Sequence, residues 1–207
     1  MTQTRWEFEA AALRQGAKWI AGVDEAGRGP LAGPVVAAAV ILAPGKIPAG
    51  VDDSKKLTPR NRQRLFEEIR DNARAVGVGI VEPPEIDRLN ILNAALQAMC
   101  LAVEKLSPAA DYLLVDGNRE ILTGLAQLAI VKGDARSLSI AAASIIAKET
   151  RDRLMVDYHR IYPAYGFDRH KGYPTIAHRT VLAQIGPCPI HRRSFRGVRE
   201  YSRHPGS

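Results

Sequence analysis

Apolar residues along this chain gather into short continuous runs and into longer stretches with helical spacing. The continuous runs lie over residues 18–24, 33–42, 76–81, 112–115 and 128–131. Runs of this length predict buried β-strands. A short loop rich in glycine and proline joins the first two runs, so we expect them to form a hairpin-like unit.

Stretches in which apolar residues recur every three or four positions predict helices. Thr58 and Pro59 mark one predicted start, because threonine caps a helix and proline suits its first position. The predicted helices cover residues 59–74, 85–106 with a potential break near Asn90, 139–162 and 175–185, after a partly helical lead-in over residues 1–17.

The order of these elements predicts an α/β protein with a mixed sheet flanked by helices. We expect a main unit over residues 18–162 and a C-terminal helical and basic extension over residues 163–207. Functional side chains of α/β proteins gather at the edge where strands end. Several acids of this chain directly follow predicted strands, so that edge is where we expect the site.

Composition narrows the class of protein further. The chain is 46% hydrophobic, which suffices for a packed core, but it contains no apolar run of roughly 18 residues that would predict a membrane span. Its N-terminus has no apolar segment typical of a secretion signal. Cys100 and Cys188 lie far apart, which indicates a reducing compartment, and we expect a cytoplasmic protein. No feature indicates an obligate dimer, so we expect a monomer.

The net charge of +7 is concentrated near the C-terminus. Five arginines lie between Gly186 and Ser207, against a single acid, Glu200. Such a cluster indicates either an anionic partner, nucleic acid above all, or a basic tail that only aids solubility. Charge alone does not separate the two interpretations.

Four acids are candidates for catalysis because of their context: Asp24, Glu25, Asp116 and Asp134. Asp24 and Asp116 each follow an apolar run, and if those strands are neighbours their carboxylates meet at one end of the sheet. Glu25 joins them if the chain turns there, and Asp134 can approach from the rim. The alternative is that each acid caps a helix, forms a turn or pairs with a cation.

These acids form a set of hard oxygen ligands without nearby cysteine or paired histidine. Such a set suits Mg²⁺ or Mn²⁺ rather than zinc. Several carboxylates can hold two ions about 3.5–4 Å apart, the arrangement that cleaves phosphodiesters by stabilising both the attacking and the leaving oxygen.

A Gly-Arg-Gly sequence at residues 27–29 is a candidate for substrate recognition. Gly27 and Gly29 lack side chains, so backbone groups there can approach a sugar and read a 2′-hydroxyl. Arg28 carries a planar guanidinium that suits phosphate. The alternative is a tight turn that merely requires glycine.

Tyr173 is a candidate for stacking on a sugar or base, although a tyrosine beside a proline can equally serve packing. Neighbouring His170, Lys171 and His178 favour a solvent-facing rim that contacts nucleic acid. Further candidates for phosphate contacts, each with a solvated surface role as the alternative, are Lys55, Lys56, Lys148, Arg192 and Arg193.

Seven blocks of the sequence resemble, in order, those of bacterial type 2 ribonuclease H, ribonuclease HII. They lie at residues 24–35, 53–57, 115–118, 132–134, 139–152, 165–175 and 189–195. The first block reads Asp-Glu-Ala-Gly-Arg-Gly-Pro-Leu-Ala-Gly-Pro-Val. Residues 119–125 and the tail after Val198 match no pattern of that family.

The resemblance implies a ribonuclease H-like fold and a metal-dependent endonuclease that cuts RNA in RNA–DNA hybrids. It further implies incision 5′ to single ribonucleotides in duplex DNA, which leaves 3′-hydroxyl and 5′-phosphate ends, and a role in removing ribonucleotides from DNA. By position, Asp24, Glu25, Asp116 and Asp134 resemble the metal-binding acids of the family. Residues 27–29 resemble its loop that reads the 2′-hydroxyl, and Tyr173 resembles its tyrosine at the RNA–DNA junction.

Two other functions remain open from the residues alone. An exonuclease or phosphodiesterase could use a similar acidic site, and it would shorten a labelled strand stepwise instead of cutting it internally. A non-catalytic nucleic-acid-binding module could use the basic tail. Adjacent buried acids argue against that module, because a phosphate binder gains nothing from a cluster of negative charge.

Overall fold

The structure is a computed structural model that describes residues 5–201 of the chain. Its centre is a five-stranded sheet with the order β3-β2-β1-β4-β5. The strands are β1 (Ile20–Ala26), β2 (Val35–Ile41), β3 (Ala75–Val81), β4 (Tyr112–Asp116) and β5 (Ala126–Ile130). The first three pair antiparallel and β1, β4 and β5 pair parallel, which confirms the predicted mixed sheet and the hairpin-like unit.

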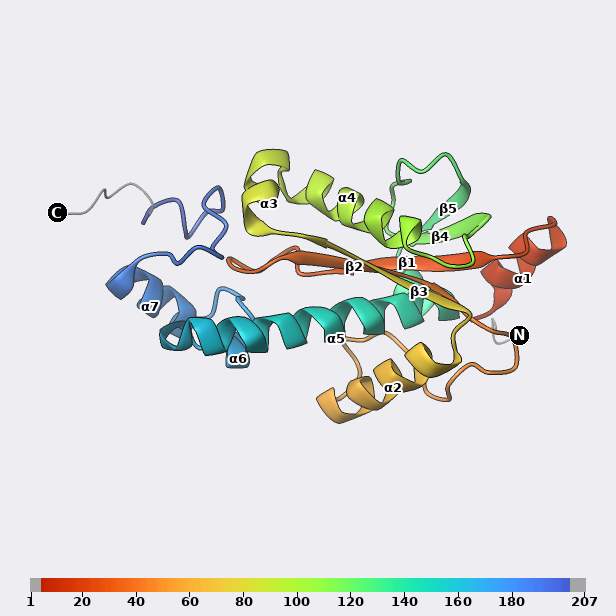
Figure 1. Cartoon of the computed structure of the whole chain (residues 1–207), viewed down its shortest axis with the longest axis horizontal. Coiled ribbons are helices and arrows are strands. Elements are labelled where there is room, and N and C mark those ends of the chain that lie inside the picture. Colours follow the sequence, from red (N-terminus) through yellow and green to blue (C-terminus); the bar gives the residue numbers. More distant parts are fainter. Residues whose placement is uncertain (1–4, 202–207) are drawn as a thin grey trace.

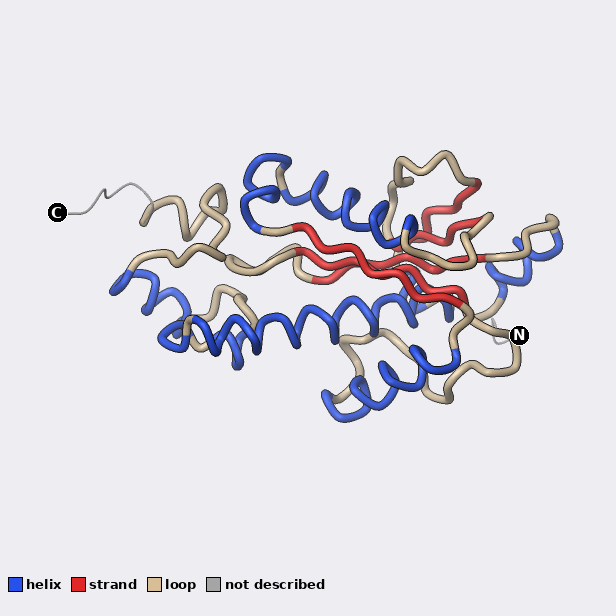
Figure 2. Tube along the Cα trace, viewed as in Figure 1, coloured by secondary structure: helices blue, strands red, loops and turns tan. Residues whose placement is uncertain are grey.

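Helices cover both faces of this sheet, with α3 and α4 on one face and α2 and α5 on the other (Figures 1 and 2). They are α1 (Glu7–Arg14), α2 (Pro59–Asn72), α3 (Pro83–Leu89), α4 (Ile91–Glu104), α5 (Leu138–Ile161), α6 (Phe167–His170) and α7 (Ile176–Ile185), with 3₁₀ turns η1 (Gly133–Ala135) and η2 (Pro163–Tyr165). None of the helices in this described part combines the length and apolar composition needed to cross a bilayer.

Local sequence explains where these helices begin and end. The Thr58 side chain accepts a hydrogen bond from the amide of Asn61, at 3.3 Å, and so caps α2 as predicted. Asn90 has a positive φ of 69° and caps α4 with its side chain. It therefore divides the predicted helix over residues 85–106 into α3 and α4.

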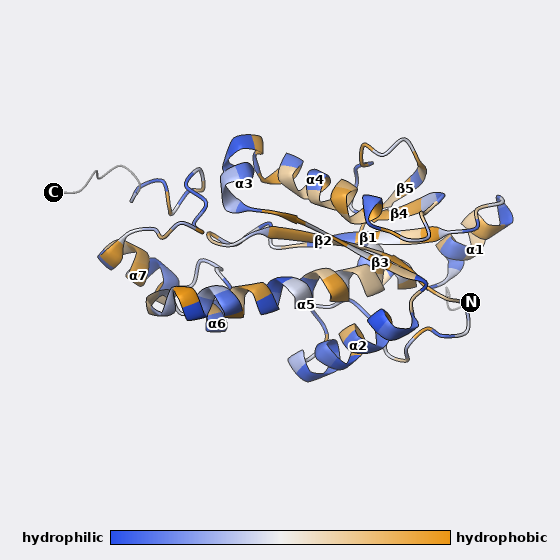
Figure 3. Ribbon diagram, viewed as in Figure 1, coloured by the Kyte–Doolittle hydropathy of each residue, from blue (hydrophilic) through white to orange (hydrophobic). Residues whose placement is uncertain are grey.

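Small residues let the helices lie close to the sheet. A Cβ added at Gly22 of β1 would come within 2.0 Å of the main-chain carbon of Ser139 in α5. The alanines that follow Ser139 are fully buried on this interface. This confirms that the alanine-rich start of α5 allows close approach. Figure 3 shows the strands in mainly hydrophobic colours and α2 beside them in mainly hydrophilic ones.

The C-terminal segments form a separate apolar cluster against the end of α5 and the β1–β2 loop. Leu31 and Ala32 from the loop pack there with Met155 of α5, Phe167 of α6 and Leu182 of α7. Helix α5 runs from the sheet into this cluster, so it belongs to both parts. The predicted boundary at residues 162 and 163, between the main unit and the C-terminal extension, therefore stays a prediction. Arg203 of the basic tail lies outside the described residues.

Candidate active site

Two neighbouring parallel strands bring Asp24 and Asp116 together. β1 pairs with β4 so that Val23 lies opposite Val115, and each acid is the next residue along its strand. Asp24 is only 4% exposed, and its carboxylate accepts a hydrogen bond of 2.7 Å from the amide of Glu25. Burial, followed by the negative charges of Glu25 and Asp116, raises the pKa of Asp24 well above its ordinary value.

Glu25 lies in the same strand instead of in a turn. β1 continues to Ala26, because Glu25 pairs with Ala37 and Ala26 with Val36 of β2. The expectation of a chain turn at Glu25 was therefore wrong. The Arg28 guanidinium lies 3.2 Å from the Glu25 carboxylate. Burial raises the pKa of Glu25, and Arg28 opposes part of that shift.

The remaining two acids meet at the end of β4. The amide of Gly133 donates a hydrogen bond of 2.6 Å to Asp116, and the 3₁₀ turn η1 places Asp134 directly after it. Lys55 lies 3.3 Å from the Asp134 carboxylate. Burial raises the pKa of Asp116, the Gly133 amide lowers it in part, and the charge of Asp134 adds to the rise.

The four acids are the type of ligand that a hard divalent cation prefers, but they are not arranged as a complete coordination site. Within residues 5–201, no three His, Cys, Asp or Glu side chains form a ready-made metal site. The four carboxylates nevertheless interact as neighbours, and three of them have raised pKa values, first because they are buried and then because other carboxylates lie nearby. Arg28 and Lys55 are the cations that face them. Oxygen ligands short of positive charge are what Mg²⁺ and Mn²⁺ prefer.

The Gly-Arg-Gly loop borders the acids and forms one wall of a cavity of about 250 Å³. Gly27 has a φ of +98°, and a Cβ there would fall 2.1 Å from Nε of Arg151, so only glycine fits. Gly29 is less constrained, since an added Cβ would lie 3.7 Å from the Tyr173 ring. The cavity is also lined by Tyr173 and Lys148, so these predicted substrate contacts do converge.

The structure corrects the prediction for Arg192. This side chain is fully buried, so it is not available for a phosphate of the substrate. Its guanidinium donates five hydrogen bonds of 2.6 to 3.1 Å, to the carbonyls of Gly27, Arg28, Pro30, Gly33 and Pro34. Burial lowers the pKa of Arg192 to about 9. Arg192 therefore holds the β1–β2 loop, which contains the Gly-Arg-Gly sequence, in place from within the protein.

Arg151 is a second support of the loop; it lies in the recognised sequence block at residues 139–152, but no role was predicted for it. It is buried and donates to the carbonyls of Pro34, Ala32 and Lys171 at 2.9 to 3.0 Å. It thereby ties the loop to the segment that carries Tyr173. Among the described residues neither Arg151 nor Arg192 has a carboxylate in hydrogen-bond contact, so main-chain carbonyls are the hydrogen-bond acceptors of both charges.

The other side chains predicted to contact phosphate are Lys55, Lys56 and Arg193, and they lie in two different places. Lys55 and Lys56 are exposed and line, with Asp116 and Asp134, a second cavity of about 400 Å³. Arg193 is exposed, and its amide donates to Asp87.

The expectation that His178 belongs to a solvent-facing rim was wrong. His178 is fully buried, with its Nε2 3.0 Å from Nε2 of His191. Burial lowers its pKa to about 4.

Two serines complete the site without having been predicted for it. Ser144 of α5 hydrogen-bonds Ser54 at 2.8 Å, and it also lowers the pKa of Asp24 in part by hydrogen bonding. Both serines line the cavity beside the Gly-Arg-Gly loop. Their presence within two of the recognised sequence blocks was the only indication available from the sequence.

Known proteins are similar to this chain in sequence and in fold over nearly its whole length. The ribonuclease HII family model matches residues 21–198. Ribonuclease HII of Geobacter sulfurreducens is 59% identical over 196 residues, covering 95% of this chain and 90% of that protein.

Solved structures show the same architecture. The crystal structure of ribonuclease H2 from Pyrococcus horikoshii OT3 has a TM-score of 0.74 at 31% identity, over 89% of this chain and 97% of that chain. Bst-RNase HIII in complex with Mn²⁺ has a TM-score of 0.67 at 20% identity, over 93% and 71% of the two chains, which shows the fold alone.

Proposed function

The chain belongs to the ribonuclease HII family and is a ribonuclease H, and we propose that it incises duplex DNA 5′ to single embedded ribonucleotides. The proposed products carry 3′-hydroxyl and 5′-phosphate ends, and the RNA strand of RNA–DNA hybrids is a second substrate. One observation carries the proposal: Asp24 and Asp116 converge at the sheet edge beside a loop, residues 27–29, that lets backbone approach a sugar. The role we propose is removal of ribonucleotides from DNA.

Asp24, Glu25, Asp116 and Asp134 are the residues that would hold two Mg²⁺ or Mn²⁺ ions. When bound, the ions would stabilise the attacking and leaving oxygens of the phosphodiester. The raised pKa values of three of these acids support this assignment, because a bound cation would offset the burial and the mutual repulsion that raise them. The solved Bst-RNase HIII complex with Mn²⁺ supports the choice of ion.

Recognition of the 2′-hydroxyl falls to main-chain amides in this proposal. The carbonyls of Gly27 and Arg28 are already engaged by Arg192. The amides of Arg28 and Gly29 have no acceptor among residues 5–201, so they are free to donate to the 2′-oxygen. That oxygen distinguishes ribose from deoxyribose.

Tyr173 stands across from Gly29 and offers its exposed ring to the next sugar. Lys148 lies beside this ring, with its Nζ 6.0 Å from the ring centroid. In this proposal, the two side chains lie where the substrate strand leaves the Gly-Arg-Gly loop.

An end-labelled duplex with one ribonucleotide tests the proposal. With Mg²⁺ or Mn²⁺ we expect a single internal cut on the 5′ side of the ribonucleotide, and no cut in EDTA. Stepwise shortening from an end would favour an exonuclease, and metal-independent binding without cleavage would favour a non-catalytic module. Equal cutting of an all-DNA duplex would contradict readout of the 2′-hydroxyl.

A further inference from the structure

The N-terminal helix contributes a buried carboxylate that the chemistry described so far does not use. Glu9 of α1 is only 1% exposed, and it lies against the start of α5. One of its oxygens accepts hydrogen bonds from the Ser137 hydroxyl at 2.6 Å, from the Ser139 amide at 3.0 Å and from the Ser139 hydroxyl. The amides at a helix N-terminus have no partner within the helix and carry partial positive charge, so a carboxylate stabilises them. Glu9 therefore fixes the first turn of α5 from outside that helix.

Arg5 extends this contact to the turn that carries Asp134. Its Nη2 donates a hydrogen bond of 2.6 Å to the main-chain carbonyl of Asp134, and its Nη1 donates one of 2.9 Å to the carbonyl of Val51. The carbonyl of Arg5 itself accepts a hydrogen bond of 3.0 Å from the amide of Leu138. Arg5 therefore joins the Asp134 turn to the first residue of α5 and to the loop at residue 51.

The turn at Asp134 has little local structure of its own to hold it. It is the 3₁₀ turn η1, a type whose hydrogen bonds have poorer geometry than those of an α-helix. Lys132, which precedes the turn, has a left-handed φ of 56°. The Asp134 carboxylate pairs with Lys55, whose side chain is 76% exposed, and an ion pair of that kind is a weak restraint. The place of this carboxylate therefore depends on what holds the start of α5.

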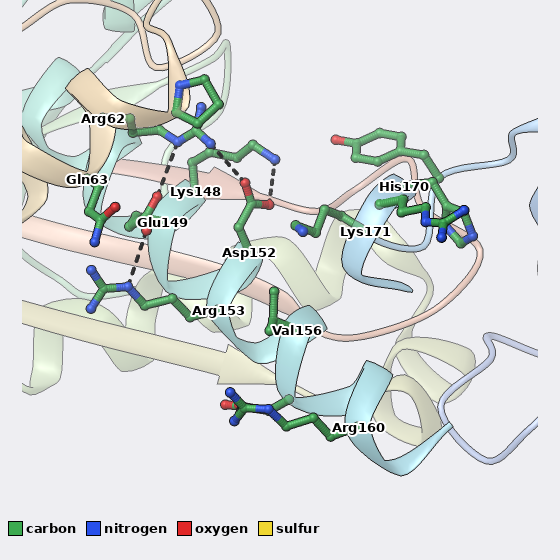
Figure 4. Close-up of a pocket in the computed structure, with 14 residues that line it drawn as sticks. Arg62, Gln63, Lys148, Glu149, Asp152, Arg153, Val156, Arg160, His170 and Lys171 are labelled. Carbon is green, nitrogen blue, oxygen red and sulfur yellow. Dashed lines mark hydrogen bonds and ion pairs between the residues drawn. The ribbon is translucent and has the colours of Figure 1, made fainter. Parts of the chain in front are cut away.

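Ion pairs anchor α5 further along the helix. Arg62 of α2 lies 3.4 Å from the Glu149 carboxylate and 3.1 Å from that of Asp152, as Figure 4 shows. Arg153 lies 3.2 Å from Glu149 on the same helix. These pairs are about three turns from the start of α5, so they hold its middle and do not reach the turn at Asp134.

We propose that Arg5 and Glu9 are positioning residues for the metal site, because they set the turn from which Asp134 presents its carboxylate. The proposal rests on the function proposed above. Neither residue touches an ion or the substrate in it; both act through Asp134. Partners that orient a metal ligand typically contribute about 10–100-fold to metal affinity.

Mn²⁺ binding, measured by isothermal titration calorimetry below the Tm of each metal-free variant, tests the role of Arg5. Arg5→Lys keeps the charge but loses the planar pair of donors that reaches two carbonyls, so we expect Mn²⁺ affinity to fall about tenfold. Arg5→Gln should weaken binding by a similar factor. Charge alone predicts the opposite, because removing a cation near the acids would strengthen Mn²⁺ binding. Unchanged affinity in Arg5→Lys, or stronger binding in Arg5→Gln, would overturn the proposal.

Two variants that lose the same charge test Glu9. Glu9→Gln keeps an acceptor for the Ser139 amide and should bind Mn²⁺ nearly as the wild-type protein does, whereas Glu9→Ala should lose about tenfold. Equal affinities of these two variants would contradict positioning by Glu9. If Glu9→Ala does not fold, the partly exposed Arg5 still decides the proposal. Arg153→Gln is the control, since it removes a cation bonded to α5 away from the turn, and its Mn²⁺ affinity should be unchanged.

The Asp134→Asn background shows whether Arg5 acts through Asp134. In that background we expect Arg5→Lys to change Mn²⁺ affinity no further, because the carboxylate that Arg5 positions is already lost. A tenfold loss that persists there would overturn the proposal. A wild-type protein that does not bind Mn²⁺, or that binds it no better than Asp24→Asn, would instead contradict the proposed function, and the positioning role with it.

Discussion

Replacing Arg192 by methionine tests whether a buried arginine positions the substrate loop. The variant keeps an unbranched side chain but leaves carbonyls of the loop without their donor. Each carbonyl buried without a partner costs about 1–3 kcal/mol. Removal of the buried charge offsets part of this cost, because the guanidinium is no longer desolvated, so we expect a net loss of roughly 3–5 kcal/mol.

This loss is a large share of the roughly 5–15 kcal/mol that stabilises a folded protein. At about 2–4 °C for each kcal/mol in a chain of this size, Tm should fall by roughly 10 °C. Activity should fall further than stability explains, since a displacement of the loop by about 1 Å can cost about a hundredfold in rate. We expect Arg192→Lys to be intermediate, because lysine keeps the charge but not the planar set of donors.

The neighbouring Arg193 provides a matched control, because it is exposed and one position away. Tm by calorimetry and kcat/KM on the ribonucleotide duplex, measured well below Tm, separate the two roles. Arg193→Met should leave Tm unchanged and weaken binding only in a salt-dependent way. An Arg192→Met variant with the Tm and kcat/KM of the wild-type protein would refute the positioning role.

Four further predictions concern the acids and the loop. Asp24→Asn should abolish cleavage yet stabilise the metal-free protein by roughly 1–2 kcal/mol in urea unfolding, because it removes a buried charge. Because the pKa values of Asp24 and Asp116 are raised, the folded protein keeps these protons to higher pH than the unfolded chain does. The free energy of unfolding of the metal-free protein should therefore fall as the pH rises from the ordinary carboxyl range through the raised pKa values. The fall should be smaller in Asp24→Asn. Added Mn²⁺ should raise the Tm of the wild-type protein and chelation should reverse it, whereas an equal rise in Asp24→Asn would argue against the site. Gly27→Ala should lose stability and activity, because alanine at this positive φ costs about 1–2 kcal/mol and its Cβ clashes with Arg151. Gly29→Ala should fold normally.

The parts of the fold that were predictable are those that local patterns determine. Short apolar runs correspond to strands here, although the run at residues 128–131 forms a largely exposed edge strand, β5. The cap at Thr58 and the break at Asn90 are properties of single residues. Asp24 and Asp116 could be grouped because each follows such a run, and the parallel pairing of β1 with β4 then places them side by side.

Burial of charged and polar side chains was not predictable in the same way. Arg192 and Arg193 are adjacent in sequence and identical in chemistry, yet one is buried and the other exposed. The difference depends on carbonyls of a loop near residue 30, which lies far away in the sequence. His178 was misjudged for the same reason, since its partner His191 approaches it only in the folded chain.

The most direct test of the account is ion-dependent incision by the wild-type protein and by Asp24→Asn on a duplex with a single ribonucleotide, beside the same duplex with deoxyribose at that position. We predict that the wild-type protein cuts once, 5′ to the ribonucleotide, only with Mg²⁺ or Mn²⁺, and that Asp24→Asn does not cut although it folds. Cutting by Asp24→Asn at the wild-type rate, or cutting of the all-deoxyribose duplex, would contradict the account.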